Sequence, residues 1–405
     1  MNTALRWYLT STACFLVPGG IQMVLFPWLV AVYLHETPER VGLAQTASQL
    51  PMLLLILWGG LLGDRVDQRR LLLRLQFAMV LPPLVMAGLV FADLIVYEVL
   101  LGWAFVGGCF GAFAQPARDA LLNRVAGREI QRVVTMAVGV QFGMQIVGFG
   151  IGSTAEWLGP AALMGTQALF MLASGLATRR IPPLPAAPPR PRRHPLHEIG
   201  EGIAAAWRSE AIRPAIFLTF SVGIFFAGTF MVILPLMVRD LYHGSSGGIA
   251  LAFVANMGGT CTTILWLMRR GGVDRPGRAL MISGCISPAL LALLHFELPL
   301  WAFYLVIYLW GLCGGISMTM SRAIVQEAAS DTHRARLMSV YSLGMMGGMP
   351  IGSVGLGWCV GQFGPRGAVL VPVVGMAIVQ LLLFTRSRLW NVRRLIEEEE
   401  AATAG

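Results

Sequence analysis

In this chain of 405 residues, 56% of the side chains are hydrophobic and only 13% are charged, and the mean hydropathy is +0.68. A soluble domain of this size does not need so much apolar surface, so the composition excludes an ordinary water-soluble protein and favours a bundle of membrane-spanning helices. The net charge of +9 arises from arginines in the predicted loops. It is weak evidence for nucleic-acid binding, and we expect no nucleic-acid partner.

Twelve segments are long and apolar enough to cross a membrane, which takes roughly 20 mainly apolar residues. Loops that carry charged residues separate them. In chain order, the predicted spans are residues 8–33, 41–63, 71–91, 95–117, 133–153, 160–178, 214–238, 247–268, 279–296, 299–320, 337–359 and 366–385.

The distribution of basic residues predicts the orientation of these spans. All 30 basic residues are arginine, and with twelve spans all but Arg40, Arg239 and Arg366 fall on one side of the membrane. Cytoplasmic loops are enriched in positive charge. We therefore predict that both termini lie in the cytoplasm and that the protein is a multi-pass component of the bacterial inner membrane.

Short sequences recur in the two halves of the chain. Phe113–Arg118, at the end of the fourth span, is echoed by Met318–Arg322, and Leu158–Pro160 is echoed by Phe363–Pro365. Such a repeat predicts two six-helix bundles with similar folds. The predicted domains are a first bundle, a cytoplasmic linker, a second bundle and a tail: residues 1–178, 179–213, 214–390 and 391–405.

The linker combines two kinds of sequence. Residues 182–195 contain seven prolines, which predict an extended tether rather than a helix. After them, Leu196, Ile199, Ile203 and Trp207 recur at helical spacing. This pattern predicts an amphipathic helix on the inner leaflet. A regulatory role for the linker remains an alternative.

Glycines four residues apart mark helices that we expect to pack closely, since small residues let membrane helices approach one another. Static packing and sliding during transport are both compatible with this pattern. The glycines are Gly139, Gly143, Gly148 and Gly152 in the fifth span, and Gly344, Gly348 and Gly352 in the eleventh.

The loop Gly60–Arg70 joins the second and third spans, and a degenerate copy, Gly272–Arg278, follows the eighth. A short, charged, glycine-containing loop in both halves of a hydrophobic chain resembles the signature of the major facilitator superfamily. The best match comprises Gly60, Leu62, Asp64 and Arg65, with Asp67 in place of the usual second glycine. The resemblance implies an all-α membrane protein with twelve transmembrane helices in two pseudo-symmetric six-helix bundles.

The resemblance also implies a cytoplasmic gate. The fold can bring Asp64 close to Arg118, and an arginine–carboxylate pair there would hold that side shut. Asp274 and Arg322 occupy the matching places in the second half and are expected to form a weaker pair. In the alternative interpretation, these charges only set the topology. The expected gating residues are Asp64, Arg65, Arg69, Arg118, Asp274 and Arg322.

No acidic residue lies near the centre of a predicted span. Buried ionisable groups are costly and usually mark ion pathways, so proton coupling is implied by the resemblance rather than by these residues. The better candidates are Asp240 and Glu156, and both also suit a role as simple interfacial charges. The six cysteines show no metal-ligand spacing, so no metal and no cofactor is expected.

In the family, spans 1, 4, 7 and 10 line the substrate cavity. Here those spans carry aromatic side chains and one amide, which suit a neutral, amphipathic or zwitterionic cargo. Packing or lipid contact is the alternative for each aromatic residue. The expected substrate-lining residues are Gln22, Phe26, Trp103, Phe110, Phe226, Phe230, Tyr304 and Tyr308.

Two segments, Gln115–Leu122 and Asp64–Leu71, resemble the branch that contains enterobactin and other siderophore exporters and macrolide-efflux proteins. The expected function is proton-driven export of a siderophore, a drug or another bulky organic molecule by a monomeric antiporter. An importer of a neutral nutrient and a transport-dead sensor or scaffold remain alternatives. We expect no enzymatic activity, because no nucleophile–base cluster stands out.

Overall fold

The computed structural model describes residues 3–126, 130–182, 195–210, 212–270, 273–329, 334–387 and 389–392. Within these ranges the chain is helical, with turns and short connections and no β-strand. The contacts divide it into two compact units. The first unit comprises Met1–Arg192 and Val238–Leu251, and the second comprises Arg193–Met237 and Ala252–Gly405.

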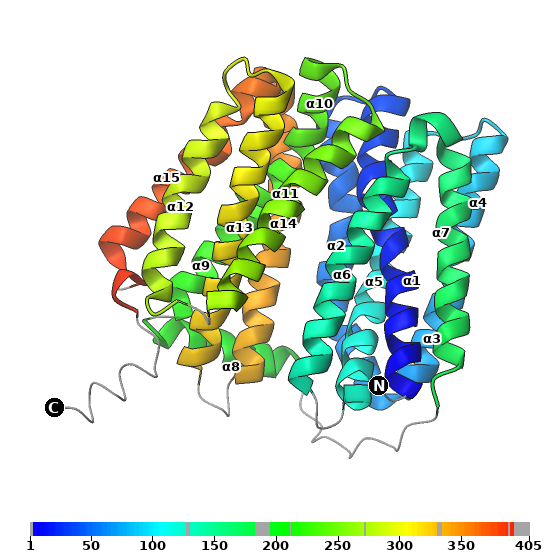
Figure 1. The fold of residues 1–405 in the computed structure, drawn as a ribbon, viewed down its shortest axis with the longest axis horizontal. Helices are drawn as coiled ribbons and strands as arrows, with labels where there is room; N and C mark the ends of the chain where they lie inside the picture. The colour runs from blue at the N-terminus through cyan, green and yellow to red at the C-terminus, as the bar shows by residue number, and fades with distance from the viewer. Residues whose placement is uncertain are drawn as a thin grey trace. The chain divides into compact units, whose positions relative to one another are not determined.

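Seven α-helices and one π-helical turn build most of the first unit (Figure 1). α3 and α4 together form the predicted third span, and α1 continues directly into the π-helix η1. The elements are α1 (Thr3–Trp28), η1 (Leu29–Tyr33), α2 (Pro38–Arg65), α3 (Gln68–Ala78), α4 (Leu81–Phe91), α5 (Tyr97–Ala126), α6 (Ile130–Gly152) and α7 (Ala155–Arg179).

The second unit begins with the short helix α8, and its next four elements form one continuous span that enters the first unit near Val238. The elements are α8 (Pro195–Arg208), α9 (Ile212–Val222), η2 (Gly223–Ala227), η3 (Thr229–Ile233), α10 (Leu234–Tyr242), α11 (Ser246–Arg270), α12 (Pro276–Leu293), α13 (Leu300–Ala328), α14 (Arg334–Ala368), α15 (Leu370–Arg386) and the 3-10 turn η4 (Leu389–Asn391).

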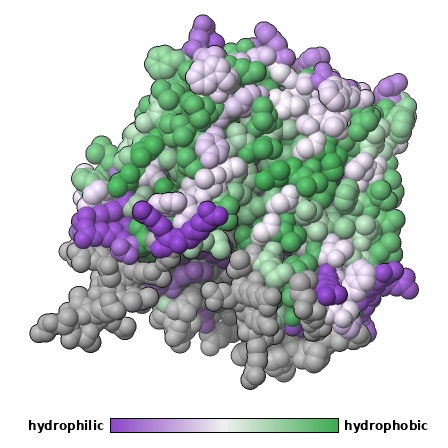
Figure 2. Space-filling view, in the orientation of Figure 1, coloured by the Kyte–Doolittle hydropathy of each residue, from purple (hydrophilic) through white to green (hydrophobic). Residues whose placement is uncertain are grey.

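The helices confirm the predicted fold class. In the described part of the chain, nine helices are long and apolar enough to cross a membrane, and two shorter apolar helices cover Met136–Gly152 and Leu370–Arg386. On the face shown in Figure 2, hydrophobic side chains cover the middle and hydrophilic ones gather toward the two ends of the helices. Such an apolar belt is the surface that a lipid bilayer requires.

Matching kinks divide α7 and α14 and mark the starts of the predicted sixth and twelfth spans. Gly159 has a φ of 77° and Gly364 a φ of 69°, a left-handed backbone region that glycine enters at little cost. Pro160 and Pro365 follow them, and proline suits the first turn of a new helix. The repeated Leu158–Pro160 and Phe363–Pro365 sequences therefore encode the same chain reversal.

Close helix pairs in each unit depend on glycine. An added Cβ at Gly148 of α6 would lie 2.5 Å from the Val17 carbonyl oxygen of α1, and one at Gly348 of α14 would lie 2.8 Å from the Ile224 nitrogen. At Gly139 and Gly143, by contrast, no neighbouring atom lies within 4 Å of the added Cβ. The predicted close approach is therefore confirmed for the second pair of fifth-span glycines and not for the first.

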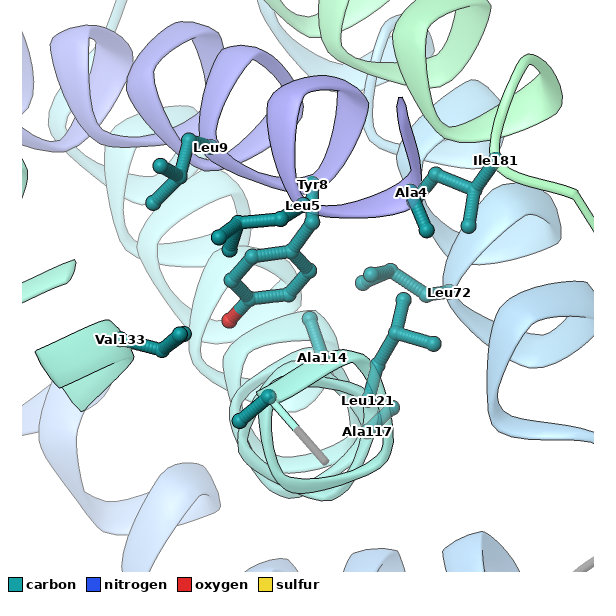
Figure 3. Close-up of a cluster of buried hydrophobic side chains, with 11 residues drawn as sticks. Ala4, Leu5, Tyr8, Leu9, Leu72, Ala114, Ala117, Leu121, Val133 and Ile181 are labelled. Carbon is teal, nitrogen blue, oxygen red and sulfur yellow. The ribbon is translucent and has the colours of Figure 1, made fainter. Parts of the chain in front are cut away.

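At one end of the first unit, side chains from α1, α3, α5 and α6 form a buried hydrophobic cluster (Figure 3). Tyr8 lies inside it and is 2% exposed. Its hydroxyl donates a hydrogen bond of 3.1 Å to the Arg118 carbonyl, so the phenol packs among apolar side chains with its polar tip satisfied. The cluster fixes α5 at the level of Arg118.

Candidate gating and substrate-lining residues

The signature loop begins where α2 ends. The backbone of α2 runs through Asp64 to Arg65, but the side chains of residues 59–65 lie outside the described part of the structure. The described part of the loop shows why an aspartate stands at position 67. Its carboxylate accepts hydrogen bonds from the backbone N–H groups of Arg69 (2.9 Å) and Arg70 (3.2 Å). Asp67 is thus the N-cap of α3, a position that aspartate favours.

Arg69 links the signature loop to the end of α7. Its Nη2 donates a hydrogen bond of 2.7 Å to the carbonyl of Arg179, the last residue of α7. Arginine side chains commonly satisfy the free carbonyls at a helix C-terminus. Arg69 therefore has a structural role in the first unit, while its predicted part in gating stays a prediction.

Arg118 is a buried cation in α5, only 5% exposed. Nη2 donates a 2.8 Å hydrogen bond to Gln115 of the same helix, and the guanidinium lies 5.2 Å from the Phe15 ring centroid. Nη1 is buried without a hydrogen-bond partner. A buried charge normally needs a counter-charge, and no ion pair of Arg118 exists among the described residues. Arg118 thus remains suited to a carboxylate that reaches it from another segment.

The corresponding residues of the second unit differ from this arrangement. Asp274, before α12, and Arg322, in α13, are both exposed. In the described part of the chain they form no ion pair with each other. The matching places in the sequence repeat therefore hold a buried arginine in one unit and an exposed one in the other.

In the first unit, the predicted substrate-lining residues contact other helices. The Gln22 carbonyl in α1 accepts a 3.2 Å hydrogen bond from Nε2 of Gln167 in α7. Phe26 is buried, and its ring centroid lies 6.1 Å from that of Trp103 in α5. Phe110 of α5 is half-buried. Helix packing thus engages Gln22, Phe26 and Trp103, and substrate contact stays a prediction.

The predicted aromatic residues of the second unit also have ring or hydroxyl partners. The rings of Phe226 and Trp310 meet edge to face at 5.6 Å, and Phe230 stacks on Phe253 at 4.3 Å. The Tyr308 hydroxyl donates a 3.1 Å hydrogen bond to Thr262. Tyr304 contacts the ring of its neighbour Phe303 at 5.2 Å.

The two candidates for proton coupling lie at helix ends. Glu156 is exposed in the first turn of α7, where a carboxylate is favoured by the helix dipole. Asp240 is paired with Arg239, whose Nη2 donates a 3.0 Å hydrogen bond to it. Arg239 Nη1 also donates to the carbonyls of Ala31 and Glu36, each at 3.0 Å. This Arg239 link ties the start of the Val238–Leu251 segment to the end of span 1 within the first unit.

Each arginine that the sequence analysis predicts to lie on the non-cytoplasmic side of the membrane is paired with a carboxylate. Arg40 pairs with Glu36 at 2.9 Å and Arg366 with Glu297 at 2.7 Å, in addition to the pair made by Arg239. The hydrogen bond to Glu36 raises the pKa of the Arg40 guanidinium above its usual value, because it stabilises the charged form. These pairs fit the interfacial role left open for such charges.

A buried polar network in the first unit was missed by the sequence analysis. Gln76 of α3 donates to Ser11 (3.1 Å) and Ser174 (2.8 Å), and its carbonyl accepts from Thr178 (2.7 Å). All four side chains are at most 2% exposed. The only available signal was the presence of polar residues inside apolar spans, which does not say which of them meet.

Comparison with known proteins agrees with this fold. A family model described as transmembrane secretion effector matches residues 3–402. The enterobactin exporter EntS of Citrobacter koseri is 26% identical over 377 residues, which cover 91% of this chain and 88% of that protein. EntS of Salmonella choleraesuis is 25% identical over 398 residues, with coverages of 96% and 93%.

Solved structures show the same architecture. The nucleoside transporter NupG aligns with a TM-score of 0.76 at 12% identity, covering 95% of this chain and 99% of that one. A bacterial homologue of the human lysosomal transporter Spinster aligns with a TM-score of 0.69 at 14% identity, covering 96% and 97%. Two helical units with repeated kinks and an apolar belt thus define a membrane transporter of the major facilitator fold. Because the family model matches nearly the whole chain, the protein belongs to the transmembrane secretion effector family.

Proposed function

We propose that this transporter exports a siderophore or another bulky amphipathic organic molecule from the cytoplasm. The observation that carries the proposal is the alignment of more than nine-tenths of the chain with enterobactin exporters. The aromatic side chains of spans 1, 4, 7 and 10 support it, since such rings offer wide contact to an amphipathic cargo. Residence in the bacterial inner membrane with both termini in the cytoplasm is part of the same proposal.

The proton gradient is the proposed energy source, with the transporter acting as an antiporter. Asp240 and Glu156 are the carboxylates available for coupling, and both lie at the ends of spans. A carboxylate that exchanges protons must be reached by water, which their exposure allows. The test compares Asp240→Asn with Glu156→Gln. Neutralising the carboxylate that couples should abolish the dependence of export on the proton gradient. Neutralising the other carboxylate should leave that dependence intact.

Export is tested by comparing a deletion strain with its parent. Under iron limitation the deletion strain should retain more siderophore inside the cell, and plasmid-borne wild-type protein should reverse the retention. Energised inside-out vesicles that contain the protein should accumulate the same compound. Equal retention across a panel of siderophores, macrolides and dyes would count against export.

The same vesicles distinguish the alternatives. An importer of a neutral nutrient would deplete inside-out vesicles of cargo rather than fill them, and a transport-dead sensor would do neither. The similarity to a nucleoside transporter shows a shared fold at 12% identity, and it does not favour nucleosides as cargo. No second function therefore has an observation of its own.

A further inference from the structure

Helix α8 is attached to the second unit along one side. It runs across the ends of the spanning helices instead of alongside them (Figure 1). Ala206 is 4% exposed, and Glu201 forms an ion pair of 2.5 Å with Arg336 near the start of α14. Ser209 then caps the next helix, accepting a 3.2 Å hydrogen bond from the Ile212 nitrogen. These contacts hold α8 against α14 and α9.

The opposite side of α8 is apolar and exposed. Gly200, Ile203, Ala204 and Trp207 are all exposed and lie on one face of the helix. Ile203 is 48% exposed and Trp207 is 70% exposed. Leaving two large apolar side chains in water is unfavourable, and their position on one face gives α8 an apolar surface that an apolar environment would stabilise.

The surroundings of this face fit a lipid bilayer. Helix α8 packs against α9, and Phe217 of α9 is also 44% exposed, so a further large apolar side chain is exposed on the neighbouring helix. Arg208 and Arg213 are exposed beside it. Tryptophan is enriched at the membrane interface, and arginines near that level attract anionic headgroups.

We propose that α8 binds anionic lipid and transmits this binding to α14. Ile203 and Trp207 insert into the leaflet that the arginine count predicts to be cytoplasmic, and Arg208 and Arg213 bind the phosphate groups. When lipid holds α8 in place, the Glu201–Arg336 pair also restrains α14, the helix that packs on η2. This regulation goes beyond the proposed export and does not depend on the identity of the cargo.

The location of α8 can be measured by cysteine labelling in nanodiscs, where both membrane faces are open to water. Trp207→Cys is placed in a Cys285→Ser background, which removes the exposed native cysteine. Arg275→Cys, in the exposed loop before α12, is the matched control. A charged maleimide should react with position 207 at least about tenfold more slowly than with position 275, the ratio expected for an apolar side chain that leaves water.

Equal labelling rates would overturn the proposal, since they would place Trp207 in water. Protection that coincides with oxidative cross-linking of two chains through position 207 would overturn it as well, because a second copy would then cover the face. The labelling measurement requires folded protein but does not require transport activity. Failure of the export proposal would therefore leave this result unaffected.

The lipid response is tested by thermal unfolding of the full chain in nanodiscs with and without phosphatidylglycerol. A ligand that binds the folded state raises the midpoint, and we expect a rise of roughly 2–4 °C for the wild type. The Arg208→Gln, Arg213→Gln double variant should lose the rise, and Arg275→Gln should keep it. An unchanged rise in the double variant would contradict the assignment of the two arginines.

A separate variant tests whether lipid binding at α8 is transmitted to α14. Glu201→Gln should leave position 207 protected from the maleimide while reducing the phosphatidylglycerol shift to that of the double variant. Exchanging the charges, with Glu201→Arg and Arg336→Glu together, should restore the shift. A full shift in Glu201→Gln would show that lipid binding reaches the bundle by another route and would refute the transmission step.

Discussion

Spans 1 and 7 occupy equivalent places in the two units, but their backbones differ where each meets its glycine partner. In the first unit, α1 stays α-helical through Gly20, which packs on Gly148 of α6. In the second unit the helix changes to a π-helix at Gly223, the residue that packs on Gly348 of α14. Each unit thus has its own close backbone contact between two glycines. The backbone hydrogen-bond pattern of the helix at that contact differs between the units.

Hydroxyl groups account for part of this difference. Around the π-helical turns, Thr219, Ser221 and Thr229 each donate to the carbonyl four residues earlier, at 2.9, 2.9 and 2.5 Å. Such bonds compete with the backbone for its acceptors and bend helices. In α1 the same bond is made by Thr10, well before Gly20. Span 7 has two π-helical turns next to its glycine contact, whereas the one in span 1 lies farther along, at Leu29–Tyr33. Because π-helical turns often lie at functional sites, we expect span 7 to deform more readily than span 1.

Buried amides show a second difference. Gln76 in the first unit has hydrogen bonds to three hydroxyl-bearing side chains. Gln380 in α15 is 4% exposed, and both its Nε2 and its Oε1 are buried without a partner. An unsatisfied buried polar group destabilises the folded state. The first unit therefore has a polar clamp, whereas the second has an unpaired amide.

The signature loops should give the largest contrast in transport. Arg118 is buried with a free Nη1, whereas Arg322 is exposed. If Asp64 completes the pair, Asp64→Asn should leave membrane insertion intact and lower transport about tenfold or more, since a charged hydrogen bond contributes roughly 1–3 kcal/mol. Asp274→Asn should have a smaller effect, and Asp64→Arg with Arg118→Asp should recover part of the loss. Wild-type efflux in the Asp64→Asn variant would refute the gate.

The glycine contacts should give the largest effect on folding. Gly148→Ala places a Cβ against the α1 backbone at Val17, Gly20 and Ile21, and such overpacking costs about 1–3 kcal/mol of folding free energy. Gly348→Ala should cost less if the π-helical turns of span 7 can shift. Gly139→Ala, with no atom within 4 Å of its Cβ, is the matched control. Thermal unfolding in detergent would measure all three, and equal midpoints for Gly148→Ala and Gly139→Ala would contradict the contact.

Substitutions of the two buried amides, Gln76 and Gln380, should have opposite effects on stability. Gln76→Leu removes one hydrogen-bond partner from each of three buried hydroxyls and should lower the free energy of unfolding by about 1–3 kcal/mol. Gln380→Met replaces an unpaired amide with an apolar side chain of similar length and should be neutral or stabilising. The comparison requires both unfolding midpoints under the same conditions. Marked destabilisation by Gln380→Met would show that its amide has a partner, such as a buried water.

The sequence predicted the spans better than the site because different physics decides the two. A membrane span needs a long apolar run, and that property is local. The same holds for the kinks at Gly159 and Gly364, which short repeated sequences encode. The π-helical turns, the Gln76 network and the unpaired Gln380 depend on neighbours from distant segments. Sequence spacing alone does not reveal those neighbours.

Gln22 has two interpretations, helix packing and substrate contact, and its neighbour Gln167 favours packing. Its substitution has the smallest effect that we expect on stability. The spacing that relates Arg118 to Arg322 places Phe226 at the position of Gln22, so an amide contact in one unit replaces the Phe226–Trp310 ring contact in the other. Gln22→Ala and Gln167→Ala should each lower the free energy of unfolding by about 1 kcal/mol. Because they remove the same bond, the double variant should cost little more than either single one. Additive losses, or altered cargo preference in Gln22→Ala alone, would instead favour contact between Gln22 and the substrate.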